Sequence, residues 1–220
     1  CTSTSTCMPS KNIISDIPEV RQNGQDHLKW AIEMSAILES QMIGGPLHSA
    51  PGIFSGNMPT QTELHFAAEN LHECGEFAST LGQKLSLEYL NRFESYLVTN
   101  VEQTKELVQM IDLPNVGIHY DTHHAHYEEY SIKEAIKLGG DDIHHIQLSE
   151  SNRGLPGKGQ VNWVETFDAI KQIGYNDWLV VESFTHKTKV LREALHIWRQ
   201  LYKSEEECYL AGLELIKKYW

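Results

Sequence analysis

Three carboxylate side chains and one amide side chain stand near the ends of short β-type segments in this 220-residue sequence. The four residues are Glu88, Asp121, Gln147 and Glu182. Carboxylates that converge repel one another unless a cation lies between them, so oxygen donors at one point predict a divalent metal site. One such residue alone is most often solvated or salt-bridged, but four at regular spacing favour a shared site.

The spacing of these donors suggests which elements must position them. Side chains alternate along a strand, so His119 and Asp121 share one face of their β-type run, and His145 and Gln147 share one face of the next. The four donors are 33, 26 and 35 residues apart along the chain, close to the roughly 30 residues per βα unit of a (β/α) barrel. The spacing therefore predicts equivalent depths in successive strands.

Helical and β-type segments alternate along the whole chain. Apolar periodicity predicts helices over 28–38, 60–81, 101–111, 163–173, 191–201 and 204–220, and a shorter one beginning at 131. Strands are predicted over 2–7, 41–45, 84–90, 116–121, 143–149 and 178–184. Such alternation favours parallel strands with right-handed crossovers, in either a doubly wound sheet or a (β/α) barrel. No GxGxxG or P-loop follows the first strand, which counts against a nucleotide-binding sheet.

Composition excludes several classes of protein. The formal net charge of −12 repels a phosphate backbone, so nucleic acid is a poor partner. No apolar run is long enough to span a membrane, and the first residues do not form a signal peptide. The four cysteines lack the spacing of a zinc knuckle or a disulfide framework. We therefore expect a reduced, cytoplasmic protein.

Four linked motifs carry a resemblance to a known family. LEYLNRFE over 87–94 resembles the LExxNRFE signature of the D-tagatose 3-epimerase and D-psicose (allulose) 3-epimerase family, and HYDTHHAHYEE over 119–129 resembles its LDTFHMNIEE segment. HIQLSESNRGLPGKG over 145–159 is similar to its HxHxxExNRxxPGxG loop, and VVESF over 180–184 to its last metal-ligand strand. The likeness covers most of the chain in the same order, and it implies a TIM (β/α) barrel of the xylose-isomerase-like type.

The resemblance also implies a ligand set for one divalent metal ion. Glu88, Asp121 and Glu182 match family ligands, but Gln147 stands where the family has a histidine. An amide oxygen is neutral and harder than imidazole, so this site should favour Mn²⁺ or Mg²⁺ over Co²⁺ or Zn²⁺. His145, two residues earlier on the same face, is the fallback ligand one layer deeper.

The family implies a C3 epimerisation of a free ketose through a cis-enediolate. Glu94, His124 and Arg153 match its substrate-binding positions, and Glu88 and Glu182 would serve as the two bases on opposite faces of the C3 carbon. The metal would bind the O2 and O3 oxygens of the sugar and polarise the C2 carbonyl. We hypothesise that the two glutamates exchange acid and base roles with the hand of the substrate.

The chain offers six strands where a closed barrel needs eight. We therefore interpret residues 1–220 as a single partial TIM-barrel domain that lacks the first two βα units and ends in the helix 204–220. Either the chain is a truncated fragment, or its exposed edge strands pair with another copy in a homo-oligomer. The family's substrate contacts from its first two strands are missing, which leaves the activity of this chain open.

Other functions remain compatible with the same residues. An aldose–ketose isomerase or an inosose isomerase or dehydratase would use the same metal site on the same barrel. An apurinic endonuclease of related fold would need a His-rich zinc cluster and a basic groove, which the charge disfavours. The alternative that is not an enzyme is a truncated, non-catalytic remnant. An enzyme that had lost its function could also have lost a ligand histidine and two barrel units.

Overall fold

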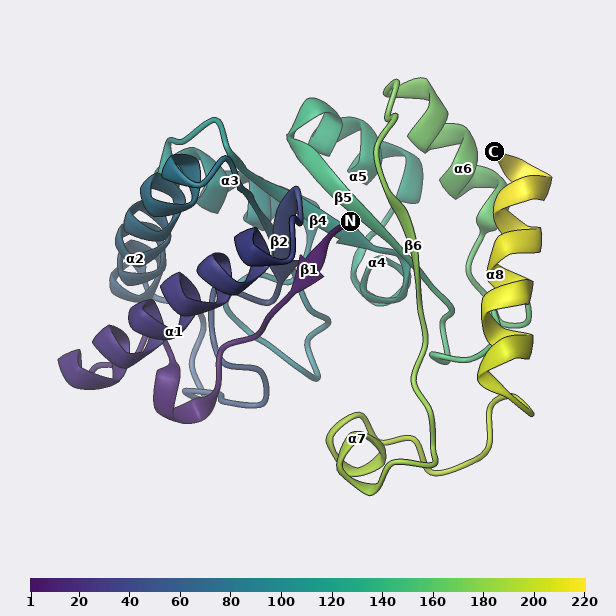
Figure 1. The fold of residues 1–220 in the computed structure, drawn as a ribbon, viewed down its shortest axis with the longest axis horizontal. Helices are drawn as coiled ribbons and strands as arrows, with labels where there is room; N and C mark the ends of the chain where they lie inside the picture. The colour runs from purple at the N-terminus through teal and green to yellow at the C-terminus, as the bar shows by residue number, and fades with distance from the viewer.

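A computed structural model describes residues 1–220. Its strands are β1 (Ser3–Thr4), β2 (Met42–Gly45), β3 (Lys84–Glu88), β4 (Val116–Asp121), β5 (Ile143–Ser149) and β6 (Leu179–Glu182). They pair in parallel in the order of the chain, forming one curled sheet with helices outside it (Figure 1). A doubly wound sheet would reverse its strand order at a switch point, so the open barrel expected from the sequence is confirmed.

Eight α-helices follow or connect the strands. They are α1 (Pro18–Ile37), α2 (Gln61–Thr80), α3 (Val101–Ile111), α4 (Thr122–Glu128), α5 (Ile132–Gly139), α6 (Trp163–Gln172), α7 (Lys189–Ala194) and α8 (Glu205–Tyr219). The capping box expected at Thr60 and Glu63 opens α2. The helix expected over 191–201 is wrong in extent, because α7 ends at Ala194 and has no buried residue that could anchor a longer helix. Helix α4 was not expected.

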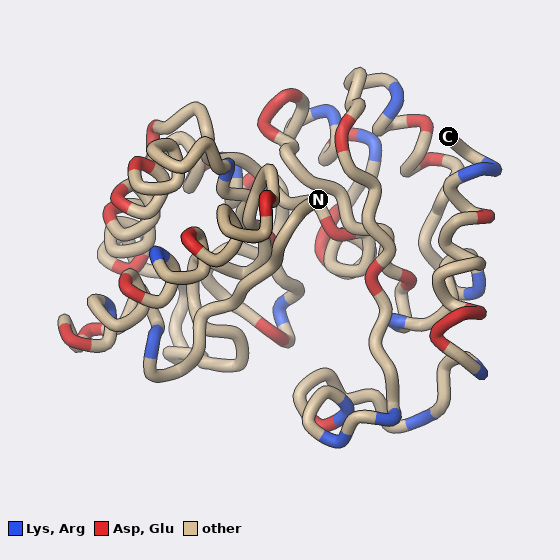
Figure 2. Tube along the Cα trace, in the orientation of Figure 1, with Lys and Arg blue, Asp and Glu red and all other residues tan.

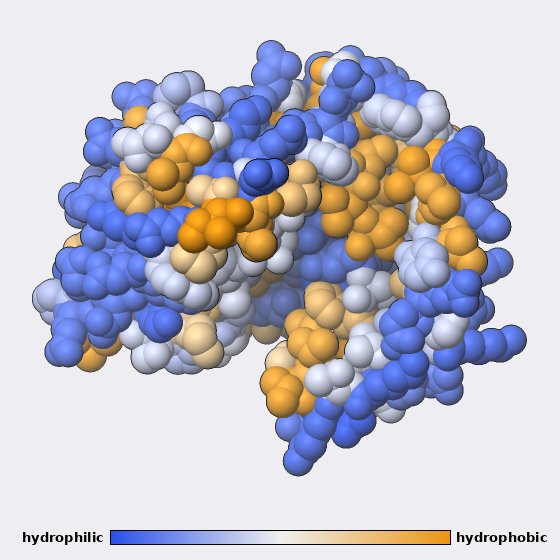
Figure 3. Space-filling model, in the orientation of Figure 1, coloured by the Kyte–Doolittle hydropathy of each residue, from blue (hydrophilic) through white to orange (hydrophobic).

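The core lies between the sheet and the helices around it. Strands β4 and β5 are buried along nearly their whole length, whereas all four residues of β6 are only half-buried. Strands β1 and β6 form the two free edges of the sheet. Hydrophobic side chains are visible at the surface between β6 and α8 (Figure 3). The barrel is therefore well packed in the middle of the sheet and open at its edges.

A side-chain contact connects the start of the edge strand β6 with the start of β2, the strand next to the other edge. The indole Nε1 of Trp178, just before β6, donates a hydrogen bond of 2.9 Å to the Oε1 of Gln41, just before β2. These residues are 137 positions apart in the sequence. One side-chain contact thus links the N-terminal ends of strands at opposite sides of the opening.

The surface carries mixed charge. Lys and Arg are scattered among the more numerous Asp and Glu, and no continuous basic stripe runs along any element (Figure 2). None of the helices combines the length and the apolar composition needed to cross a lipid bilayer.

Candidate active site

The four predicted donors lie at the carboxyl ends of neighbouring strands. Glu88, Asp121 and Glu182 are the last residues of β3, β4 and β6. Gln147 lies in β5 directly opposite Asp121 in the strand register. In a parallel barrel these ends open at one rim, where side chains from different strands meet. The regular spacing in the sequence therefore corresponds to a common location in the fold.

Arg153 and His124 join the carboxylates into one buried cluster. The Arg153 Nη1 donates hydrogen bonds to the Asp121 Oδ2, at 2.9 Å, and to the Glu182 Oε2. The His124 Nε2 lies 3.6 Å from the Glu88 Oε1. Ligand atoms of Glu88, Asp121 and His124 all lie within 4.8 Å of one another. Arg153, expected to bind substrate, thus also holds two carboxylates of the expected metal site.

Gln147 makes the donor set suitable for a hard divalent cation. Its side chain is 4% exposed, and its Oε1 has no hydrogen-bond partner. A buried amide oxygen without a partner costs free energy, and such an atom beside Asp121 is suited to coordination. Carboxylate and amide oxygens are ligands that Mg²⁺ and Mn²⁺ prefer. The residues present therefore fit a single cation of this kind.

Asn91 and Arg153 hold the His124 ring from two sides. The Asn91 backbone N–H donates to the His124 Nδ1 at 2.9 Å, and the Arg153 Nη2, which can only donate, lies 3.0 Å from the His124 Nε2. Burial lowers the pKa of His124 well below its usual value, despite the opposing charge of Asp121. Donor groups thus face both ring nitrogens of His124, and its Nε2 lies between the Arg153 guanidinium and the Glu88 carboxylate.

Glu94 lies at the edge of the same cluster. Its Oε1 accepts a 2.8 Å hydrogen bond from the Asn91 Nδ2, and its carboxylate comes within 4.8 Å of nitrogens of His123 and His124. The side chain is half-buried. All the residues expected at the site therefore lie in one region, and Glu94 occupies its more open side.

The three carboxyl groups have different pKa values because their surroundings differ. Burial, followed by the charges of Glu182 and Asp121, raises the pKa of Glu88. Burial and the Asp121 charge likewise raise the pKa of Glu182. Burial also acts on Asp121, but the Arg153 guanidinium outweighs it and holds that pKa below its usual range. Asp121 is thus kept ionised, whereas the two glutamates keep a proton to higher pH than an ordinary carboxyl group does.

Glu150 holds the loop that presents Arg153. Its fully buried carboxylate accepts hydrogen bonds from the backbone N–H groups of Ser151, Gly157 and Val161 and from the Trp163 Nε1, at 2.8 to 3.0 Å. Arg153 itself has a φ of 60°, which is rare for a residue other than glycine. The network formed by Glu150 thus stabilises a loop conformation that Arg153 would not adopt alone.

Replacing Glu150 with alanine is expected to destabilise the protein by at least about 3 kcal/mol, because four donors, three of them buried, lose a charged acceptor. The melting temperature should fall by roughly 6–12 °C. Glu206→Gln, at an exposed position in the first turn of α8, is the control and should change stability by less than about 0.5 kcal/mol. Equal melting temperatures for the two variants would contradict the role given to Glu150.

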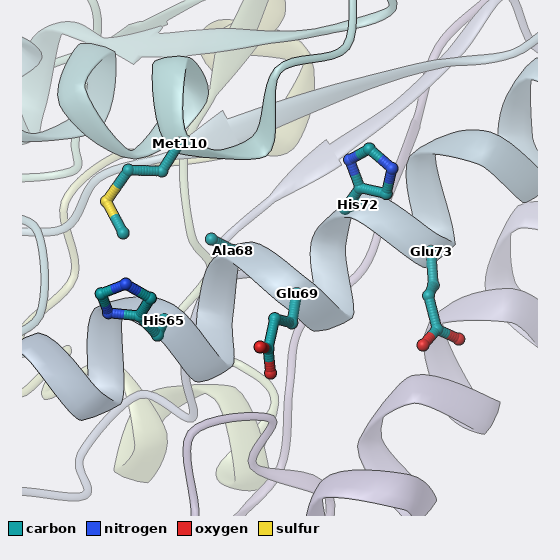
Figure 4. A pocket seen from close by; sticks show the side chains of 6 residues that line it. All are labelled: His65, Ala68, Glu69, His72, Glu73 and Met110. Carbon is teal, nitrogen blue, oxygen red and sulfur yellow. The ribbon is translucent and has the colours of Figure 1, made fainter.

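A second group of histidines and glutamates, on α2, does not form a comparable site. A surface depression there is lined by His65, Ala68, Glu69, His72, Glu73 and Met110. The histidine and glutamate side chains spread along α2, Met110 comes from α3, and the side chains do not point toward a common centre (Figure 4). The Nδ1 atoms of His65 and His72 each bond to a backbone carbonyl. We therefore assign the chemistry to the strand ends.

Three residues that support the site were not among the candidates from the sequence. Asn91 orients His124, Glu150 organises the Arg153 loop, and His119 lies with its Nδ1 3.9 Å from the Glu88 Oε2. The alternation of side chains already placed His119 on the face of Asp121. The other two lie within the motifs, but their roles depend on contacts that spacing alone does not show.

Comparison with known proteins identifies similar sequences and folds. The model of a family described as "Xylose isomerase-like TIM barrel" matches residues 2–218. The chain is 30% identical over 198 residues to a D-psicose 3-epimerase from Ruminiclostridium cellulolyticum, covering 90% of this chain and 68% of the relative. It is 31% identical over 193 residues to a D-psicose 3-epimerase from Agrobacterium fabrum, covering 87% and 67%. This chain thus spans about two thirds of the length of these relatives.

A solved structure shares the fold. The crystal structure of D-psicose 3-epimerase with D-tagatose from Clostridium cellulolyticum H10 superposes with a TM-score of 0.91 at 28% identity. The superposition covers 99% of this chain and 76% of that one.

Proposed function

Because the chain belongs to the xylose isomerase-like TIM barrel family, we propose that it is a metal-dependent ketose 3-epimerase. The observation that carries this proposal is the pair of glutamates at the ends of β3 and β6, the buried Glu88 and the half-buried Glu182, on either side of Asp121, and their surroundings raise the pKa values of both. Epimerisation at C3 needs one base on each face of the carbon, and two glutamates from different strands can supply them. The ketose 3-epimerases similar to this chain support the same reaction.

The proton transfers fall to the two glutamates. In one direction, the Glu182 carboxylate takes the proton from C3 and a protonated Glu88 returns one to the opposite face. In the other direction their roles reverse. A raised pKa suits this exchange, because each group must be able to hold and release a proton near neutral pH. The configuration of the substrate at C3 then determines which glutamate removes the proton.

The cation site would serve the same step. Bound by Glu88, Asp121, Gln147 and Glu182, a divalent cation would supply positive charge that stabilises an enediolate derived from the sugar. The oxygen-only donor set supports Mn²⁺ or Mg²⁺ over Co²⁺ or Zn²⁺.

The neighbouring donors would hold the sugar in place. His124 and Arg153 lie side by side, with the Arg153 Nη2 3.0 Å from the His124 Nε2. The positively charged guanidinium is a donor suited to a sugar oxygen that gains negative charge. Glu94, on the open side, would accept a hydrogen bond from a sugar hydroxyl group. Positioning of this kind fixes C3 between the two bases.

Product analysis tests the function. The protein, loaded with Mn²⁺, is given free ketoses such as D-psicose and L-ribulose in D₂O, together with aldoses and inososes. We expect the C3 epimer with deuterium at C3. Deuterium at C1 or C2 would instead indicate an aldose–ketose isomerase, and dehydration would indicate the inosose reaction. A chain that binds no Mn²⁺ at millimolar concentration and converts no sugar would be a non-catalytic remnant.

Two further properties belong to this proposal. None of the four cysteines is in a disulfide, which supports a reducing compartment such as the cytoplasm. The free edges at β1 and β6 support association with another copy, because unpaired strand edges favour pairing with a second chain. Sedimentation of the purified chain would test the oligomer directly.

A further inference from the structure

His48, in the loop that follows β2, is completely buried beside the end of β3. Its Nε2 lies 3.0 Å from the backbone carbonyl oxygen of Glu88, and its Nδ1 lies 2.9 Å from the Ser49 Oγ. A carbonyl oxygen can only accept, so Nε2 carries the ring hydrogen and donates it to Glu88. In the neutral ring, Nδ1 then accepts the hydroxyl hydrogen of Ser49. Both nitrogens of this imidazole are thus paired, and one of them holds the backbone of a proposed base.

The Glu88 carbonyl lies where β2 no longer supports β3. The register of these two strands ends with Gly45 opposite Leu87, so Glu88 extends one residue beyond its neighbour on that side. On the other side, Glu88 is still opposite His119 of β4. The hydrogen bond from His48 therefore continues the support of the strand to its last residue, which is the residue that carries the carboxylate.

The loop after β2 is itself fixed on both sides of His48. Gly45 has a φ of 122°, and a Cβ at this position would collide with the carbonyl oxygen of Ser5, so the chain can turn here only because the residue is glycine. Beyond His48, the Ala50 backbone N–H donates to the Asn12 Oδ1 at 3.1 Å. The imidazole is thus attached to a loop that holds it against β3.

We propose that His48 is a positioning residue for Glu88, whose backbone it fixes so that the carboxylate enters the site in one direction. The hydrogen bond restrains the peptide group between Glu88 and Tyr89, and the side chain of Glu88 projects from the same backbone. A base acts efficiently only when it is held within hydrogen-bond reach of the proton that it removes. This inference rests on the base role that the proposed function gives to Glu88, and it adds a residue that lies outside all four sequence motifs.

Ser49 allows positioning to be separated from simple packing of the loop. Its Oγ lies 3.4 Å from the Ser95 Oγ, so the hydroxyl groups of Ser49 and Ser95 join the loop after β2 to the loop after β3. Removing the Ser49 hydroxyl group would break this link and the bond to the His48 Nδ1, but the Nε2 would still donate to Glu88. If packing alone mattered, variants of Ser49 and His48 should have similar effects.

Kinetics of the full chain loaded with Mn²⁺ test the proposal. His48→Asn, whose amide reaches only the position of Nδ1, should lower kcat for C3 epimerisation by a factor of about 10 to 100 and change KM less than about threefold. His48→Gln, whose longer side chain brings an amide N–H to the position of Nε2, should restore most of the rate. Ser49→Ala should retain a rate within about threefold of the wild type. Circular dichroism checks that each variant folds.

Histidine ¹⁵N NMR of the metal-free full chain tests the contact without catalysis or metal. The signal that is absent from His48→Gln identifies His48, and we expect a ring hydrogen on Nε2. A hydrogen on Nδ1 alone would overturn the proposal. So would a His48→Asn variant with the wild-type rate, or equal losses in the Asn and Gln variants. A wild-type chain that epimerises no ketose would contradict the proposed function, whereas the NMR result would still decide whether His48 holds the backbone of Glu88.

Discussion

Glu182→Gln is expected to lower the rate of C3 epimerisation by a factor of roughly 10² to 10⁴, the range that one general acid or base contributes. The amide cannot take up the C3 proton, yet its oxygen can still bind a cation. Mn²⁺ affinity should therefore fall much less than the rate. Chromatography of the epimers, alongside a metal titration, measures both quantities on the same preparation.

Exchange of the C3 proton with solvent deuterium tests whether Glu88 and Glu182 act as two separate bases. In D₂O, the Glu182→Gln variant should still exchange the C3 proton of the epimer whose proton faces Glu88, while forming almost none of the other epimer. Glu88→Gln should show the opposite preference. Glu73→Gln, which only weakens an exposed ion pair between α2 and Lys29 of α1, is the matched control and should retain activity. Loss of exchange from both epimers in each single variant would rule out independent bases.

Arg153→Met is expected to destabilise the metal-free protein by about 3–5 kcal/mol at neutral pH. The Arg153 guanidinium is the shared partner of Asp121 and Glu182, and both carboxylates are left without a countercharge when it is removed. Urea unfolding in the presence of EDTA measures the loss. Arg153→Lys keeps the charge and should lose less, because it cannot reproduce the fork-shaped contacts.

The same variant should respond to pH and to metal in a defined direction. In the wild-type protein Arg153 holds the pKa of Asp121 low, so its contribution to stability is present above the unfolded pKa and disappears as the pH falls through the folded one. The deficit of Arg153→Met should therefore shrink on acidification. Millimolar Mn²⁺ should also reduce it, because an ion that binds only the folded state stabilises that state. A deficit independent of both would contradict this account.

The sequence predicted best where local chemistry and packing agree. The strands 116–121 and 143–149 match β4 and β5 at both ends, because alternating side chains and polar end residues define them. The location of the donors near the ends of successive strands followed from the length of a βα unit, but their expected equal depth was wrong for Glu88 and Glu182, because only Asp121 and Gln147 lie opposite each other in the register. These features need no knowledge of distant contacts.

Prediction from the sequence failed for elements whose structure depends on contacts between residues far apart in the chain. Helix α4 has no apolar stripe to reveal it, and it begins because the Asp121 Oδ1 accepts the His123 N–H. In the stripe over 191–201 only Ile197 is buried, outside the main core, and the helix stops before it at Ala194. The left-handed backbone of Arg153 depends on the carboxylate of Glu150, three residues earlier in sequence but fixed by donors up to thirteen residues away.

The position of β6 at the edge of the sheet should affect the two directions of the reaction differently. Glu88 projects from a strand paired on both sides, whereas Glu182 projects from a strand paired on one side only. Fluctuations of an edge strand are larger than those of an interior one. One face of the sugar would thus meet Glu88, whose position is rigid, and the other would meet Glu182, whose position fluctuates more. The two directions of epimerisation should differ in how steeply they respond to heating, the direction that begins at Glu182 being the more sensitive.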